Sequence, residues 1–261
     1  MNTYFNYNQT YNKITLEFCN SVKLSEREIH PYHEILYLED TSVTLFTENN
    51  QSKLSGNQLL VIPKGKYHWF DLSGVKHFTR LKISIPDNLL DALPVRLFGG
   101  GICTVFSKSP TCDLLVKRIM KLLQGERDER TAFHAYSAAM LLLAELDASE
   151  LKEDPSAPAD NAILSRVTAH ISENLSGDLS IDALAKLSNA SVSFLSHTFQ
   201  KKMGISLHRY IVQKRLILAK EKIAGGEKPS KIYRECGFGD YSSFYKAYLR
   251  YFSSPPSADE R

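Results

Sequence analysis

The sequence lacks the features that define several classes of protein. It has four cysteines among 261 residues, none with C-x-x-C spacing, so neither a disulfide scaffold nor a cysteine metal motif is expected. No apolar run approaches the ~20 residues that a membrane-spanning helix needs. Residues 1–11 lack the charged and apolar pattern of a secretory signal. These absences predict a cytoplasmic protein with reduced thiols and no membrane segment.

The chain also lacks a strong excess of charge of either sign, because 32 Lys and Arg residues stand against 29 Asp and Glu. The charge is nevertheless unevenly distributed. Residues 160–261 contain 15 basic and 10 acidic residues, a net charge of +5, whereas residues 1–159 contain 17 and 19, a net charge of −2. Because nucleic acids are polyanions, a contact with nucleic acid is expected in the C-terminal part.

The length favours two domains. Their boundary is predicted at residues 149–161 (SELKEDPSAPADN), where two prolines and small or charged residues disfavour regular structure. We therefore expect a domain over residues 1–148, a linker over 149–161 and a second domain over 162–261. The predicted fold class is α+β, with a β-rich first domain and an all-α second domain.

Residues 1 to about 110 have the pattern of an all-β sandwich or small barrel, with short alternating apolar runs separated by turn residues. Strands are predicted over 14–18, 34–38, 43–47, 59–62 and 78–83.

Two helices are predicted next, over 112–124 and 131–147. The second is apolar over much of its circumference through residues 138–144 (AAMLLLA), so more than one of its faces must be buried. Either this helix lies wholly inside its domain, or part of it pairs with a second subunit in a homodimer.

A helical pattern occurs twice in the C-terminal part. Three pairs of apolar residues are each separated by 49 positions: Leu195 and Phe244, Phe199 and Tyr248, and Met203 and Phe252. Each copy is typical of a short helix, a tight turn and a longer second helix whose buried stripe these residues form. Ser191 and Asp240 are expected N-caps, and Gly237 suits a turn with positive φ. A long helix over 207–223 joins the copies.

The outward faces of the two longer helices carry few of the Glu and Lys residues that a merely solvated helix would favour. Short polar and aromatic side chains of this kind hydrogen-bond to base edges and phosphates. The predicted DNA-binding residues are Ser193, Ser196, His197, Gln200 and Lys201 in the first copy, and Tyr241, Ser242, Tyr245 and Lys246 in the second. The second copy carries the better-equipped face, and the first is expected mainly to set the position on the duplex.

A segment of the β region resembles the second motif of the cupin family, through Gly56, Pro63, Gly65 and His68 in the spacing G-x6-P-x-G-x2-H. The resemblance to the first cupin motif is incomplete. In cupin enzymes these motifs bind a metal, and two or three His with a carboxylate suit a divalent transition metal. We expect no metal and no cofactor here, and instead a small organic effector in the barrel mouth. The candidate residues are His30, His33, Glu34, Tyr37, His68, Trp69 and Arg80.

The stretch 179–256 resembles the DNA-binding domain of the AraC/XylS family of bacterial transcription regulators. The resemblance is carried by Ala185, Ser191, Leu195, Phe199, Lys201, Gly204, Tyr210, Arg215 and Ala219, and then by Ile232, Gly237, Phe238, Ser242, Phe244, Lys246, Phe252 and Pro256. It implies a sequence-specific activator rather than an enzyme, with promoter DNA and RNA polymerase as partners. It also implies two recognition helices in successive major-groove segments and a cupin-like regulatory domain.

Four positions depart from the family pattern. Tyr233 replaces a small residue, Ser253 replaces the usual Gly, and Asp259 and Glu260 stand where the family tends to have Tyr and Arg. These changes leave the packing of the last turn open. Two other functions also remain open: a regulator controlled by a protein partner instead of a small molecule, and a metal-dependent cupin enzyme with a helical appendage.

Overall fold

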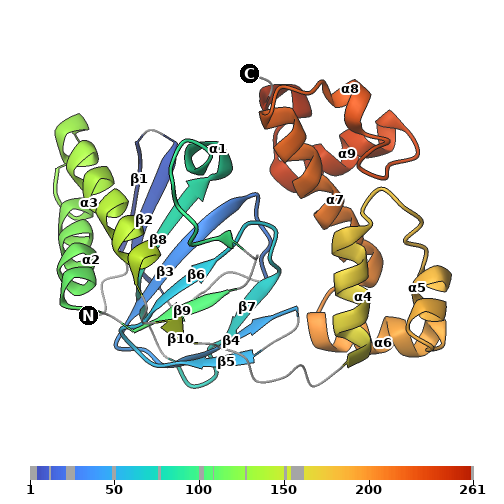
Figure 1. Cartoon of the computed structure of the whole chain (residues 1–261), viewed down its shortest axis with the longest axis horizontal. Helices are drawn as coiled ribbons and strands as arrows, with labels where there is room; N and C mark the ends of the chain where they lie inside the picture. Colours follow the sequence, from blue (N-terminus) through green and yellow to red (C-terminus); the bar gives the residue numbers. More distant parts are fainter. Residues whose placement is uncertain are drawn as a thin grey trace. The chain divides into compact units, whose positions relative to one another are not determined.

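The computed structural model describes residues 5–11, 13–21, 27–48, 51–75, 78–99, 103–107, 109–126, 128–149, 152–153 and 162–259. The chain divides into two compact units, Met1–Ala157 and Pro158–Arg261 (Figure 1). Of the predicted linker 149–161, only Ser149 and Lys152–Glu153 lie within the described residues. Lys152–Glu153 form a short strand of the first unit, so this unit extends beyond residue 148.

Two antiparallel sheets form the first unit. The larger has the order β1 (Phe5–Tyr11), β2 (Ile14–Ser21), β8 (Phe78–Pro86), β3 (Tyr32–Glu39), β6 (Leu59–Ile62), β9 (Thr104–Phe106), β10 (Lys152–Glu153). The smaller has the order β5 (Gln51–Leu54), β4 (Val43–Thr47), β7 (His68–Asp71). The five predicted strands are confirmed as β2, β3, β4, β6 and β8. A two-sheet α+β architecture agrees with the predicted fold class.

Strand β3 shows why the larger sheet is buried on both faces. Ile35 and Tyr37 belong to a core between this sheet and the helices, while Leu36 and Leu38 belong to a second core against the smaller sheet. Successive side chains of a strand point to opposite faces, so every residue from His33 to Leu38 is buried. The apolar run Ile35–Leu38 is therefore buried on both faces, and His33 and Glu34 are buried directly before it.

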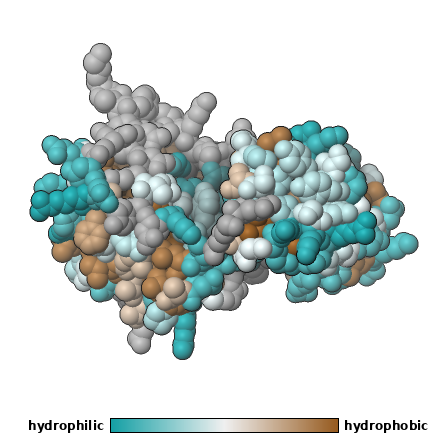
Figure 2. Space-filling model, turned by 90° about the horizontal axis from the view of Figure 1, so that it is seen from above, coloured by the Kyte–Doolittle hydropathy of each residue, from teal (hydrophilic) through white to brown (hydrophobic). Residues whose placement is uncertain are grey.

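Helices α2 (Pro110–Leu123) and α3 (Glu129–Ala148) cover one face of the larger sheet, and α1 (Asp87–Leu90) follows β8 (Figure 1). The predicted helices over 112–124 and 131–147 are thus confirmed. Helix α3 buries Ala135, Ala139 and Leu142 against the sheet. Its outer side leaves Leu141 59% exposed, and Leu114 of α2 is 68% exposed. Hydrophobic patches are visible on the surface of the first unit in Figure 2.

The second unit is helical. It comprises α4 (Ala162–Glu173), α5 (Ile181–Leu187), α6 (Val192–Met203), α7 (Leu207–Ala224), α8 (Pro229–Ile232), α9 (Tyr241–Phe252) and the 3-10 helix η2 (Pro256–Asp259). The long helix α7 packs against α6 on one side and against α8, α9 and η2 on the other. Among the described residues, no helix is long and apolar enough to cross a membrane.

The predicted repeat is confirmed at residue level. Leu195, Phe199 and Met203 are fully buried, as are Phe244 and Tyr248, whereas Phe252 is half-buried.

The predicted N-caps are confirmed as well. Ser191 Oγ accepts a hydrogen bond from the Phe194 amide at 3.2 Å, and Asp240 Oδ1 accepts one from the Ser243 amide at 2.8 Å. The two helices therefore begin where the sequence predicts.

Candidate nucleic-acid interface

The predicted face of α6 is open to solvent. Ser193, His197, Gln200 and Lys201 are exposed, and Ser196 is half-buried. They lie opposite the stripe of Leu195, Phe199 and Met203 that anchors the helix. Lys201 and Lys202 lie in the last turn of α6, so the exposed polar residues of the preceding turns carry no lysine or arginine.

Helix α9 has a matching outward face. Tyr241 and Tyr245 are 39% and 38% exposed, and Ser242 and Lys246 are exposed. Tyr241 and Tyr245 are four positions apart, as are Ser242 and Lys246, so each pair lies on one side of the helix. Lys246 supplies a cation in the middle of this side, where it can donate to guanine O6 and N7.

Two aromatic residues outside the predicted DNA-binding set also border these faces. Phe194, in the first turn of α6, is 51% exposed beside Ser193, where an apolar ring can contact a thymine methyl group. Tyr233, just after α8, packs edge-on against Tyr241 with ring centroids 5.8 Å apart. The Arg234 guanidinium lies 5.6 Å from the Tyr233 ring centroid. In the sequence, the signal for Tyr233 is that it stands where the family has a small residue.

Arg215, in the middle of α7, ties the two copies of the repeat together. Its Nε and Nη2 donate to the carbonyl oxygens of Leu175 and Gly177 at 2.9 and 3.0 Å, in the loop that leads into α5. Its guanidinium also packs against Gly237, which has a φ of 81°. A Cβ at this position would lie 2.5 Å from the Leu175 oxygen and would clash with Arg215. Glycine at position 237 therefore allows the loop before α5 and the turn at Gly237 to contact the same Arg215 side chain.

In the first unit, the structure brings three of the seven candidate effector residues together. His30 Nε2 lies 2.7 Å from Glu34 Oε2, and His68 Nε2 lies 3.9 Å from the same oxygen. All three side chains are buried. Glu28 joins them, and one ligand atom from each of the four residues lies within 4.8 Å of the others. Burial alone would raise the pKa of Glu34, but Lys82 and the hydrogen bond from His30 outweigh it and hold that pKa well below its usual range.

The other four candidates lie elsewhere, for a reason that strand geometry supplies. His33 precedes Glu34 in β3 and so points to the opposite face, where its Nε2 lies 3.0 Å from Asp87 Oδ1. Tyr37 lies on that same face, in the core beneath the helices, and donates to Asn57 Oδ1 at 2.6 Å. Burial lowers the pKa of His33, although Asp87 opposes the shift. His33 and Tyr37 are thus separated from His68 by the sheet.

Trp69 and Arg80 are also engaged outside the cluster. Trp69 stacks on Phe46 with ring centroids 5.2 Å apart, and as the neighbour of His68 in β7 it points to the other face of the smaller sheet. Arg80 pairs with Glu17 and donates from Nε to Cys19 Sγ at 3.2 Å. The structure thus shows no single cavity lined by all seven predicted residues among those it describes.

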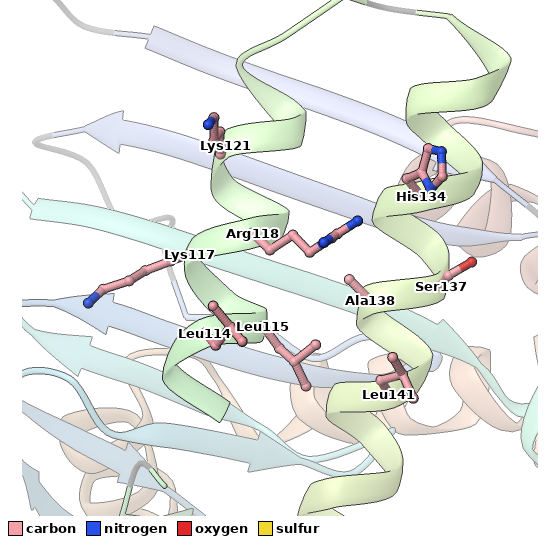
Figure 3. A pocket seen from close by; sticks show the side chains of 9 residues that line it. All are labelled: Leu114, Leu115, Lys117, Arg118, Lys121, His134, Ser137, Ala138 and Leu141. Atoms are coloured by element: carbon pink, nitrogen blue, oxygen red, sulfur yellow. The ribbon is translucent and has the colours of Figure 1, made fainter. Parts of the chain in front are cut away.

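A groove lies instead on the outer side of the helical hairpin, between α2 and α3 (Figure 3). Its volume is about 590 Å³. The floor is apolar, and Arg118 and Lys121 rise from α2 opposite His134 of α3 (Figure 3). The lining residues are Leu114, Leu115, Lys117, Arg118, Lys121, His134, Ser137, Ala138 and Leu141.

Comparison with known proteins supports the helical unit most directly. A family model described as a helix-turn-helix domain matches residues 184–261. The regulatory protein SoxS of Escherichia coli is 31% identical over 96 residues, which cover 36% of this chain and 90% of SoxS. The probable transcriptional regulator LumQ of Photobacterium leiognathi is 35% identical over 89 residues, covering 34% of this chain and 36% of LumQ.

The solved structure of ToxT from Vibrio cholerae aligns with 94% of this chain and 97% of its own, with a TM-score of 0.41 and 10% identity. The matched segment spans between 32% and 44% of the length of LumQ and two other curated relatives. These relatives are transcription regulators, not enzymes, and the likeness to them lies in the second unit.

Proposed function

Because the chain belongs to the AraC family of DNA-binding transcription regulators, we propose that it binds promoter DNA by placing α6 and α9 in successive major-groove segments. The observation that carries this proposal is the pair of capped, solvent-exposed helices held on opposite parts of α7. Helix α7 has 18 residues and is therefore about 27 Å long. One turn of DNA spans about 34 Å, so a rigid connector of this length suits two contacts on one side of a duplex.

We assign base contacts to Ser193, Ser196, His197 and Gln200 of α6 and to Tyr241, Ser242, Tyr245 and Lys246 of α9, with Lys201 nearer the phosphates. Exposure of these side chains and burial of the stripe behind them support the assignment. Binding of the full chain to promoter fragments, measured against salt concentration, tests it. Lys246→Ala is expected to lose about 1–3 kcal/mol of discrimination at one base. Unchanged base preference in that variant would remove α9 from the interface.

The direction of control is a proposal that rests on the family resemblance. We propose that the protein activates transcription and that RNA polymerase is its partner at the promoter. Transcription from a promoter that carries the selected site, measured with and without the protein, checks the sign. Repression in that assay would overturn the activator assignment while leaving DNA binding intact.

For the first unit we propose a regulatory role with two alternative sources of control. A small-molecule effector is the first, and ligand-induced changes in DNA affinity test it. A protein partner is the second, and a specific observation favours it: the side chains of His30, Glu34 and His68 are buried and packed against one another. The groove between α2 and α3 is a separate feature of this unit.

A second copy of the chain is the occupant we propose for that groove. Leu114 and Leu141 line this groove and are largely exposed, and the cations Arg118 and Lys121 line it as well. Glu145, one helical turn beyond Leu141, is exposed. If two α3 helices cross antiparallel at Leu141, Glu145 of one subunit lies opposite Ser137 of the partner, next to Arg118. Twofold symmetry then brings the two Leu141 side chains together and pairs Glu145 of each subunit with Arg118 of the other.

A further inference from the structure

The buried cluster in the first unit has the donor set of a metal site. Zn²⁺ and similar ions prefer His nitrogen and carboxylate oxygen, at about 2.0–2.2 Å from the metal. Glu28, His30, Glu34 and His68 offer two of each, with all four ligand atoms within 4.8 Å of one another. Two carboxylates would also match the charge of a divalent cation. By chemistry and number of donors, the cluster fits the metal that the cupin resemblance implies.

The backbone orients both histidines toward the centre of the cluster. His30 Nδ1 lies 2.7 Å from the carbonyl oxygen of Tyr32, and His68 Nδ1 lies 3.0 Å from that of Lys66. A carbonyl oxygen only accepts, so each Nδ1 donates and each Nε2 is left for the cluster. Carbonyl groups orient metal-binding histidines in the same way.

The place of the cation is nevertheless filled by the protein itself. The Lys82 ammonium, on β8, lies 3.4 Å from Glu28 Oε2 and 3.5 Å from Glu34 Oε2. Lys82 is 9% exposed, and its Nζ lies 5.6 Å from the centroid of the Tyr32 ring. Its position therefore combines two carboxylates with an aromatic face. A divalent ion bound to the same carboxylates would lie within a few ångströms of this ammonium, and the two would repel each other.

The donors of the cluster also contact one another. His30 Nε2 and Glu34 Oε2 are 2.7 Å apart. A metal ion bound between them would have to break this contact as well as displace the Lys82 ammonium.

We propose that Lys82 is a built-in replacement for the metal ion, so that the four donors form a latent metal site that opens only when the charge of Lys82 is removed. The Lys82 ammonium also holds the surrounding chain in place, as a metal ion at this site would. It holds Glu28, whose backbone pairs with that of His68 through two 2.9 Å hydrogen bonds, and so fastens the segment from Arg27 to His30 to β7.

Cobalt(II) titration of the full-length protein, followed by visible absorption and equilibrium dialysis, tests this proposal. The wild type and Lys82→Arg, which keeps the cation, are expected to take up no stoichiometric cobalt. Lys82→Met keeps the volume without the charge and is expected to bind one equivalent, with an affinity gain on the order of 100-fold. Adding His68→Ala to Lys82→Met should abolish this uptake.

Two results would overturn the proposal. One is stoichiometric, His68-dependent cobalt binding by the wild type. The other is a folded Lys82→Met protein that binds no cobalt. Thermal melting with and without cobalt shows whether that variant folds. If it does not fold even with metal, Lys82→Gln replaces it, and failure of a folded Lys82→Gln protein to bind cobalt counts equally against the proposal.

Discussion

The hydroxyl of Tyr248 donates a 2.6 Å hydrogen bond to Oδ2 of Asp259, which joins the last turn of the chain to α9. Lys220 of α7 donates to both oxygens of the same carboxylate, at 2.7 and 2.8 Å. Burial and the Asp259 carboxylate raise the pKa of Tyr248 well above its usual value. Asp259 departs from the family pattern, and this bonding explains how the last turn packs with a carboxylate in that position.

Asp259→Ala is expected to lower the free energy of unfolding of the second unit by about 1–3 kcal/mol, because it leaves the buried Tyr248 hydroxyl without its partner. Urea denaturation followed by circular dichroism measures the change. Tyr248→Phe is the matched control: it removes the hydroxyl and should cost less than Asp259→Ala. Equal stability of Asp259→Ala and the wild type would show that this contact does not hold the turn.

Tyr233→Ala is expected to change base preference without unfolding the protein. The Tyr233 ring supports Tyr241, so its loss frees Tyr241 to change rotamer and weakens selection at the base that Tyr241 contacts. Selected DNA sites for wild type, Tyr233→Phe and Tyr233→Ala provide the measurement. Tyr233→Phe retains the ring contact and should match the wild type. A uniform loss of affinity over all sequences, with unaltered preference, would point to a general effect on folding instead.

Self-association through the α2–α3 groove predicts a charge-reversal pattern. Arg118→Glu and Glu145→Lys should each weaken the dimer by about 1 kcal/mol, and the double variant should recover the loss because the ion pair is restored with opposite signs. Analytical ultracentrifugation gives the dissociation constants. A monomeric wild type would exclude this interface, as would additive effects in the double variant.

Stability in acid is expected to depend on Asp240. Hydrogen bonds from the Ser243 backbone amide and hydroxyl lower its pKa in the folded protein. A lowered folded-state pKa stabilises the fold above the pKa of the unfolded chain, about 3.9, and this contribution is lost as the pH falls through the lower value. Asp240→Asn still caps α9 but does not titrate. Its melting temperature should therefore fall less steeply than that of the wild type between pH 5 and pH 2.5, and parallel curves would refute this role.

The sequence predicted the helical unit more completely than the β unit, and the reason is the length of the signal. The stripes through Leu195 and Phe244 recur over three turns, and the caps Ser191 and Asp240 mark where each helix begins. Strands β1, β5, β7 and β9 were missed because they are short or polar. Strand β7, for example, is the tetrapeptide HWFD, which carries no alternation long enough to detect.

The buried cluster shows what sequence reasoning could not supply. His30 and His33 both lie near Glu34 in the sequence, but only His30 contacts the Glu34 carboxylate. To distinguish them, one must know where β3 begins, because His33 lies inside the strand and points to the face opposite Glu34. No sequence motif includes Glu28 or Lys82. Glu28 precedes β3, and Lys82 lies in β8, more than 40 residues after Glu34 in the sequence. Their meeting depends on the pairing of β3 with β8, which places Lys82 beside Leu36.

Selection of DNA sites by the full-length protein measures whether α6 and α9 contact bases together. If both helices enter the major groove, the enriched site has two blocks of preferred bases whose centres are about 10 base pairs apart. Lys246→Ala should weaken preference at a base in one block only, and His197→Ala at a base in the other. A single block, or unchanged preference in both blocks after Lys246→Ala, would show that the two helices do not read bases together.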